Sequence, residues 1–238
     1  MARDKTELFI SGFLILSVIF LAVNYDLAIA STLGLFILFS VAMFFMLPAR
    51  ITHNSKPKNT FNAIGWGLGA VVALLIVSLF LASFSGFLNV VAEPTLASIQ
   101  SSGFSSLGID KIIPQSSQPI FARSAFLTIF TFGVIIAAVE TRMLGRAMEW
   151  LSVVFNVNLN KPNIKVFAIF FLLSGLFVWY HANAKGVVNN FALLITFLFA
   201  FASLEMIRRT KELEGATYFH MFNNLLYIIP QVQGQLGG

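Results

Sequence analysis

The chain has 238 residues, of which 58% are hydrophobic and 11% are charged, and its 27 phenylalanines outnumber its 15 basic and 10 acidic residues together. A soluble domain carries roughly 25% charged residues. The apolar excess is larger than one core can bury, so it excludes a soluble globular domain and predicts helices that face lipid. The sequence contains no cysteine, which excludes disulfides, thiolate metal sites and cysteine nucleophiles.

Seven apolar stretches predict an all-α, polytopic membrane protein with about seven transmembrane helices, within a range of six to eight. In chain order they lie at Leu8–Val23, Leu27–Leu47, Phe61–Val91, Arg123–Phe155, Ile164–Ala184, Val188–Ile207 and Ala216–Ile229. The first stretch runs into the second, so we expect an uncleaved membrane anchor rather than a secretory signal. We expect residues 1–238 to form a single integral membrane domain.

The basic residues are distributed unevenly among the predicted loops. Only Lys111, Arg123 and Lys185 fall on one side of the membrane. Ten fall on the other side, namely Arg3, Lys5, Arg50, Lys56, Lys58, Lys161, Lys165, Arg208, Arg209 and Lys211. Basic residues in short loops mark the cytoplasmic side, so the N-terminus is predicted to be cytoplasmic. The net charge of +5 then reflects orientation and not nucleic-acid binding, and residues 93–119 form a long non-cytoplasmic loop.

Glu140, Glu149 and Glu205 lie within or at the end of predicted helices, where an ionisable group needs a partner or a purpose. Glu205 is followed by Arg208 and Arg209 at spacings of three and four, which predicts ordinary ion pairs at a helix end. Glu140 lies about 200° around its helix from Arg142. It is the acidic group that no simple pairing explains.

The residues after Glu140 have a structural interpretation of their own. Arg142, Arg146 and Glu149 follow one another at spacings of four and three, which places them on one helical face. A structural ladder of ion pairs at the end of the helix accounts for these three side chains without any chemistry.

Two histidines stand on predicted helices beside regularly spaced partners. His181 follows Phe177 by four residues, and His220 precedes Asn224 by four, so each pair shares one helical face. Either histidine alone is typical of a membrane interface. With Glu140, however, they supply a base for water, an imidazole to orient it and donors for an oxyanion, which suffice for peptide hydrolysis without a metal.

These residues resemble the motifs of the CAAX-type membrane proteases and their bacterial relatives, the CPBP or Abi family of glutamate-dependent intramembrane proteases and bacteriocin-immunity proteins. That family carries Glu-Glu-x-x-x-Arg, Phe-x-x-x-His and His-x-x-x-Asn/Asp in order. The matching segments are Glu140 to Arg146, Phe177 to His181, and His220 to Asn224. They place a protease-like core at residues 123–230.

The resemblance implies a catalytic set and no metal or other cofactor. Glu140 would activate the attacking water, His181 would help to hold it, and His220 and Asn224 would stabilise the oxyanion. The partners would be the lipid bilayer and a hydrophobic or lipidated peptide.

The first motif departs from the family pattern. Thr141 replaces the second Glu, and Gly145 stands where the family places Arg. Arg146 or Arg142 would fill the supporting role of that Arg, and Phe177 supports the second motif. The departures keep a second function open: a non-catalytic member of the fold, acting as an immunity protein or as an accessory subunit with a membrane-protein partner.

Two further classes are less well supported. A transporter would explain intramembrane Glu and His residues, but the sequence lacks a second half that resembles the first. A zinc site at Glu140, His181 and His220 is chemically allowed, yet no His-Glu-x-x-His motif is present. Counting the helical rise from these helix starts puts His181 on the opposite side of the membrane from Glu140 and His220; the motif order predicts that they meet, and we follow the motif order.

Overall fold

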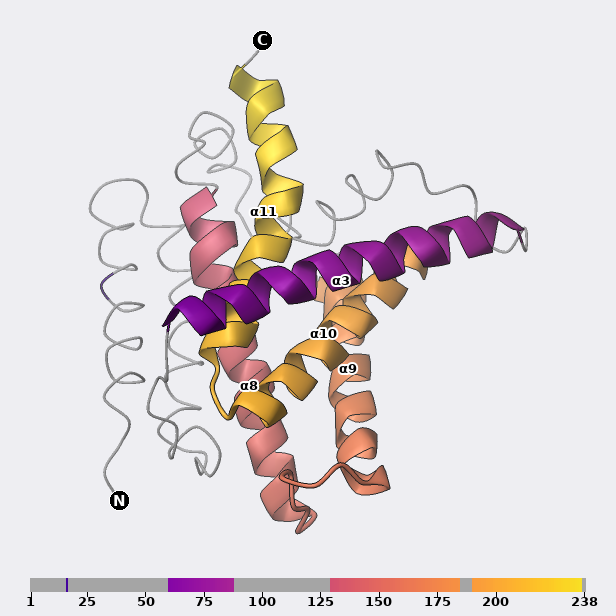
Figure 1. Cartoon of the computed structure of the whole chain (residues 1–238), viewed down its shortest axis with the longest axis vertical. Helices are drawn as coiled ribbons and strands as arrows, with labels where there is room; N and C mark the ends of the chain where they lie inside the picture. Colours follow the sequence, from indigo (N-terminus) through magenta and orange to yellow (C-terminus); the bar gives the residue numbers. More distant parts are fainter. Residues whose placement is uncertain (1–15, 17–59, 88–128, 185–189, 237–238) are drawn as a thin grey trace.

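The computed structural model describes residue 16 and residues 60–87, 129–184 and 190–236. The regular elements of this part of the chain are all helical (Figure 1). Apart from Leu16, the predicted helices Leu8–Val23 and Leu27–Leu47 lie outside the described residues, and so does the predicted loop 93–119. The all-α prediction is therefore confirmed over the described ranges.

The described helices follow the predicted apolar stretches closely. They are α3 (Thr60–Phe87), the π-helix η1 (Ile129–Ile136), α8 (Ala137–Val154), α9 (Ile164–Ala184), α10 (Asn190–Thr210) and α11 (Glu214–Leu236). The bounds of α9 are those predicted. Within the stretch predicted as Arg123–Phe155, residues 129–154 are divided between η1 and α8, and residues 123–128 lie outside the described residues. Helix α11 continues through Pro230, beyond its predicted end.

Three helices are long and apolar enough to cross a membrane, at Thr60–Leu81, Ile164–Ala182 and Asn190–Thr210. The protein is thus a membrane protein, whereas the count of seven spans stays a prediction. Helix α8 is not among the three, because four ionisable residues lie along it. These side chains are buried against other helices, and so α8 belongs to the interior of the fold.

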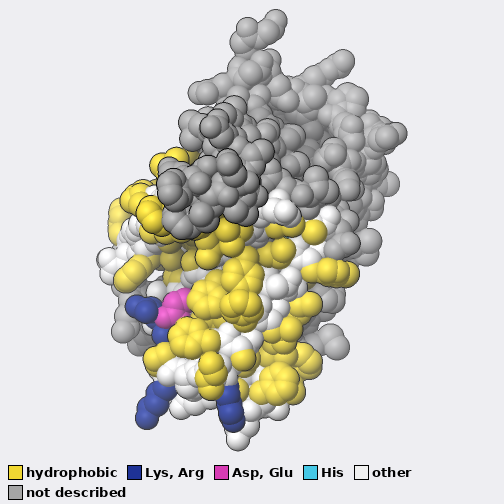
Figure 2. All heavy atoms as spheres, turned by 90° about the vertical axis from the view of Figure 1, so that its right-hand side faces the viewer, with side chains coloured by type: hydrophobic (Ala, Val, Ile, Leu, Met, Phe, Trp, Pro, Cys, Tyr) yellow, Lys and Arg dark blue, Asp and Glu magenta, His cyan; other side chains and the backbone are white. Residues whose placement is uncertain are grey.

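Helix α3 differs from its neighbours in direction and in exposure. It runs across the direction of α8, α9 and α11 at a steep angle (Figure 1), and it presents Phe61, Ile76 and Phe80 to the outside. The close crossing with α11 depends on Gly67, where a Cβ atom would lie 2.8 Å from the Cβ atom of Tyr218. Figure 2 shows that apolar side chains cover much of the described surface and that basic side chains gather toward one end. Such a surface suits lipid or an apolar partner.

The core lies where α8, α9, α10 and α11 meet. Met148, Phe170, Phe199, Leu204 and Phe219 are among its fully or almost fully buried side chains. Close contacts between aromatic rings hold α9 to α10, and Phe199 joins α10 to α11 by packing 4.7 Å from the Phe219 ring, centroid to centroid. Burial of such rings supplies apolar area and edge or face contacts together.

The α8–α9 hairpin shows whether Glu140 and His181 lie at the same depth along the helices. Its turn covers residues 155–163, where Asn156 adopts a positive φ of 49° and the Asn163 side chain accepts a hydrogen bond from the backbone N–H of Val166 at 3.0 Å. The two helices run in opposite directions from this turn (Figure 1). Glu140, near the start of α8, is therefore at the same end of the hairpin as His181, near the end of α9. The rise count was wrong because it started at Arg123. Counted from the turn, α8 ends at Val154, 14 residues after Glu140, and α9 begins at Ile164, 17 residues before His181, so both side chains lie at a similar distance from it.

Candidate functional site

Glu140 lies in the first turn of α8 and faces His220 of α11. Its Oε2 atom is 3.4 Å from His220 Nε2, and each side chain is only 6% exposed. Helix α8 continues from η1 without a break, so Glu140 does not stand at a free helix N-terminus, where the helix dipole would stabilise a carboxylate. The group on α11 that lies next to this carboxylate is thus the imidazole of His220.

Thr141 holds the other nitrogen of the same imidazole. Its Oγ1 atom is 3.1 Å from His220 Nδ1, and the contact is buried. When the hydroxyl donates to Nδ1 of a neutral ring, the ring proton must be on Nε2, which faces Glu140. When the ring is protonated, Nε2 carries a proton as well. With the hydroxyl as donor, Thr141 thus keeps an N–H group at Nε2, the ring nitrogen 3.4 Å from Glu140 Oε2.

Aromatic side chains surround the two histidines. The Phe177 ring centroid is 4.3 Å from that of His181 and 6.4 Å from that of His220, so Phe177 lies against both. The ring of Phe199 closes another side of His220, at 4.7 Å. Because these rings exclude water, the electrostatic interactions of the imidazoles are stronger than they would be in solution.

His181 is oriented by its own helix. Its Nδ1 atom is 2.8 Å from the carbonyl oxygen of Phe177. A carbonyl oxygen only accepts, so Nδ1 must carry the proton, and Nε2 of the neutral ring is an acceptor. The neighbouring Tyr180 packs edge-on against the His181 ring at 5.2 Å and interacts electrostatically with Glu140. The end of α9 thus faces the Glu140 region.

Asn224 lies one turn beyond His220 on α11 and is also buried. Its side-chain amide donates a 2.8 Å hydrogen bond to the carbonyl oxygen of Phe132 in η1. Short π-helical segments are frequent at functional sites, and here the amide ties the π-helix to α11. This bond uses one of the two N–H groups of Asn224.

The supporting arginine of the first motif has a structural partner. Arg146 Nη1 is 2.7 Å from Glu149 Oε2, and these two side chains are 2% and 0% exposed. Arg142 is buried as well. Gly145, where the family places its Arg, packs tightly: a Cβ atom there would lie 2.5 Å from Leu213 Cδ2 and 3.3 Å from Ile207 Cδ1. An arginine does not fit at position 145 in this packing. The 2.7 Å contact confirms the predicted ion pair between Arg146 and Glu149.

The structure brings together part of the set predicted from the sequence. Glu140 and His220 are in contact, and Phe177 touches both His220 and His181. Asn224 shares the His220 face of α11, but its amide points to η1 through the Phe132 bond. The Glu205 prediction is confirmed, with Arg208 Nε at 2.6 Å and Arg209 Nε at 2.5 Å.

Three members of the site were missed as contacts of the histidines. The sequence identified Thr141 only as the residue that replaces the second Glu of the motif. Because it directly follows Glu140, it lies at the same end of α8, and this could have indicated its contact with His220. Phe199 and Tyr180 carry no sequence pattern that distinguishes them from the many other aromatic residues. Their contacts follow from the packing of α9 and α10 on α11.

No group of three His, Cys, Asp or Glu side chains converges as a metal site within the part of the chain that the structure describes. The chain matches no protein-family model, and comparisons with curated proteins and with solved structures return no significant match. The chemistry of the site therefore has to be argued from its own geometry.

Proposed function

We propose that the protein is an intramembrane endopeptidase that hydrolyses a hydrophobic or lipidated peptide with a water activated by Glu140. The observation that carries this proposal is the buried contact between the Glu140 carboxylate and the His220 imidazole. A carboxylate at 6% exposure is shielded from bulk water, and burial of this kind is how enzymes make a carboxylate a better base.

The proposed reaction needs one base and one set of donors. Glu140 takes a proton from water while the water oxygen attacks the peptide carbonyl carbon. His220 Nε2–H donates to the oxyanion that forms, and Thr141 holds the ring in the donating state. The protonated Glu140 then gives its proton to the leaving nitrogen, the C–N bond breaks, and the carboxyl and amine products separate. His181, with its Nε2 as an acceptor, helps to hold the water, and the second N–H of Asn224 assists at the oxyanion.

The surroundings of the site support an apolar substrate. Phe177 and Phe199 line the imidazole of His220, and the helices that carry the site are flanked by helices of membrane-spanning length and composition. A polar peptide would lose its hydration without compensation there. We further propose about seven spans with a cytoplasmic N-terminus, supported by the distribution of Lys and Arg along the sequence.

The decisive experiment compares two glutamate variants of the purified, reconstituted protein. With a peptide library that includes prenylated C-termini, Glu140→Gln should abolish cleavage, because the amide cannot accept the proton of water. Glu149→Gln, a matched change of another buried glutamate on α8, should lower stability and leave the rate per folded molecule within a few fold. Cleavage that survives in Glu140→Gln would overturn the proposal.

A second candidate is a non-catalytic member of the same fold, an immunity protein or an accessory subunit. Two observations favour it. The Asn224 amide donates to the Phe132 carbonyl, and Arg146 is paired with Glu149. Both contacts join parts of the fold to each other and leave these groups less available to a substrate. Under this alternative, the wild type would cleave nothing and would co-purify with a stoichiometric membrane-protein partner. The same partner would be retained by Glu140→Gln.

A further inference from the structure

A separate cavity lies between α3, the end of α10 and the beginning of α11. Its volume is about 770 Å³, within the roughly 300–1,000 Å³ typical of small-molecule sites. One part is apolar and lined mainly by small residues, including Gly69, Ala70, Ala73 and Ala202, with Trp66 beside them. We call this apolar part, lined by small side chains of α3 and α10, the trough.

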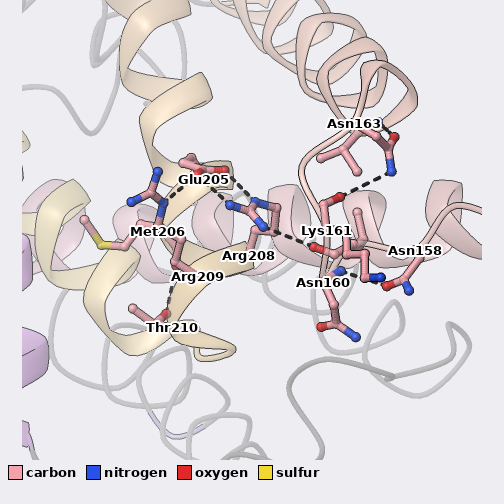
Figure 3. A network of polar contacts seen from close by, with 11 residues as sticks. Asn158, Asn160, Lys161, Asn163, Glu205, Met206, Arg208, Arg209 and Thr210 are labelled. Atoms are coloured by element: carbon pink, nitrogen blue, oxygen red, sulfur yellow. Dashed lines mark hydrogen bonds and ion pairs between the residues drawn. The ribbon is translucent and has the colours of Figure 1, made fainter.

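The other part of the cavity is polar and carries charges of both signs. Arg209, Thr210 and Glu212 line it together with Glu205. The Arg209 side chain is 69% exposed and donates to Glu205 through Nε, which leaves its two terminal nitrogens without a hydrogen bond to any residue the structure describes. Figure 3 shows Arg208 and Arg209 meeting Glu205 from different sides.

The turn that carries Glu212 is held in place by hydrogen bonds. Thr210 Oγ1 lies 2.9 Å from the Met206 carbonyl oxygen and accepts a hydrogen bond from the backbone N–H of Glu212 at 3.3 Å. Within the described part of the chain, the hydrogen bonds of Glu212 are made by its backbone, and its carboxylate takes part in none of them. The cavity thus presents a guanidinium and a carboxylate, both available, next to an apolar trough.

We propose that this cavity binds one phospholipid with a primary-amine headgroup, of the phosphatidylethanolamine type. The phosphate would lie on the terminal nitrogens of Arg209, the ammonium on the Glu212 carboxylate, and one acyl chain along Gly69, Ala70 and Ala202. Arginine binds phosphate through its paired N–H groups, and a primary ammonium donates hydrogen bonds that a choline cannot.

The position of the cavity agrees with a lipid headgroup. Helix α10 is one of the candidate spans and ends at Thr210, so Arg209 and Glu212 lie where a spanning helix leaves the hydrocarbon. Trp66, which is 60% exposed, is of the residue type enriched at that depth. Phosphatidylglycerol has the same phosphate but a neutral glycerol in place of the ammonium, so it offers Glu212 no opposite charge and is disfavoured.

The test measures retained lipid by native mass spectrometry of the full chain, titrated in detergent with phosphatidylethanolamine, phosphatidylcholine or phosphatidylglycerol. We expect one ethanolamine lipid to bind per chain, at least about tenfold more tightly than the other two, from the loss of one charge-assisted hydrogen bond. Inorganic phosphate alone should not compete, because it lacks the ammonium and the acyl chain.

A pair of glycine variants tests the trough. Position 69 has open space around a Cβ atom, and so does position 65, which does not line the cavity. Gly69→Leu should weaken binding about tenfold by filling the trough, and Gly65→Leu on the same helix should leave it unchanged. Both changes suit a helix, since Leu is a better helix former than Gly.

The charged groups are tested by Arg209→Gln and Glu212→Gln. Glu212→Gln is the sharper of the two, because it disturbs no hydrogen bond of the described residues, and it should remove the preference for ethanolamine over choline. Equal binding of the three lipids, or equal effects of Gly69→Leu and Gly65→Leu, would overturn the proposal. Neither result depends on peptide cleavage, so this proposal and the endopeptidase proposal fail independently.

Discussion

Glu140 and Glu205 are both acidic residues on helices of a membrane protein, and their surroundings differ in a way that separates chemistry from structure. Glu205 is 24% exposed and bound by two arginines at 2.5 and 2.6 Å, whose charges are permanent near neutral pH. Glu140 is 6% exposed and faces an imidazole at 3.4 Å, a group that exists in a neutral and a protonated form. The first arrangement fixes a carboxylate in one state, while the second allows a proton to move.

After the loss expected from Glu140→Gln itself, the largest expected effect comes from the imidazole. His220→Gln removes the group that faces Glu140 and should reduce peptide cleavage by about 10²–10³-fold, the usual loss for one oxyanion donor. Arg208→Gln, the corresponding change at the partner of Glu205, should leave cleavage within a few fold. The rates are compared per folded molecule in the reconstituted system. Equal losses in the two variants would mean that the two glutamates do not differ in role.

The buried ion pair of α8 should dominate stability. Arg146→Met leaves Glu149 as a buried charge and should lower the free energy of unfolding by about 3–5 kcal/mol. Adding Glu149→Met should restore most of this loss, because the double variant buries no unpaired charge. The exposed partner of Glu205 is the matched control: Arg209→Met should cost no more than about 1 kcal/mol. Unfolding titrations in detergent measure all three variants. A double variant no more stable than Arg146→Met would contradict the pairing.

Removal of the Thr141 hydroxyl should have an intermediate effect. Thr141→Val leaves His220 Nδ1 buried without its donor, which should cost about 1–3 kcal/mol, and it should also change the pH dependence of cleavage, because the tautomer is no longer set. Thr196→Val is the control, since its hydroxyl donates to the Ala192 carbonyl on its own helix. Unchanged pH profiles in both variants would show that Thr141 does not orient the ring.

The local features of the fold were predictable, and the long-range ones were not. The bounds of α9 follow from an apolar run that starts after Asn163, and the pairs of Glu205 follow from spacings of three and four. The π-helix η1 was not predicted, because its contact with Asn224 joins residues 92 positions apart. The contact of Thr141 with His220 spans 79 positions. Composition and helical periodicity identify buried faces, but they do not say which helices meet.

The smallest expected effect concerns Lys211, which follows α10 next to the Glu205 cluster. Burial lowers the pKa of Lys211 below its usual value, and the nearby Arg208 lowers it further. Because the folded pKa lies below the unfolded one, the charged lysine destabilises the fold at neutral pH, and this penalty fades as the pH rises through the folded pKa toward the unfolded pKa.

Lys211 also adopts a positive φ of 62°, which costs a non-glycine residue roughly 1–2 kcal/mol and costs glycine far less. Lys211→Gly should therefore raise the free energy of unfolding by up to about 1 kcal/mol near pH 7, with the gain shrinking at alkaline pH as the wild-type lysine loses its charge. Lys211→Met, which removes the charge and keeps the strain, separates the two causes: its gain should be smaller and should vanish at alkaline pH. If the gain in Lys211→Gly did not depend on pH, the whole effect would come from the backbone strain. The charge of Lys211 would then cost the fold no stability, as expected for the paired charge of Glu205.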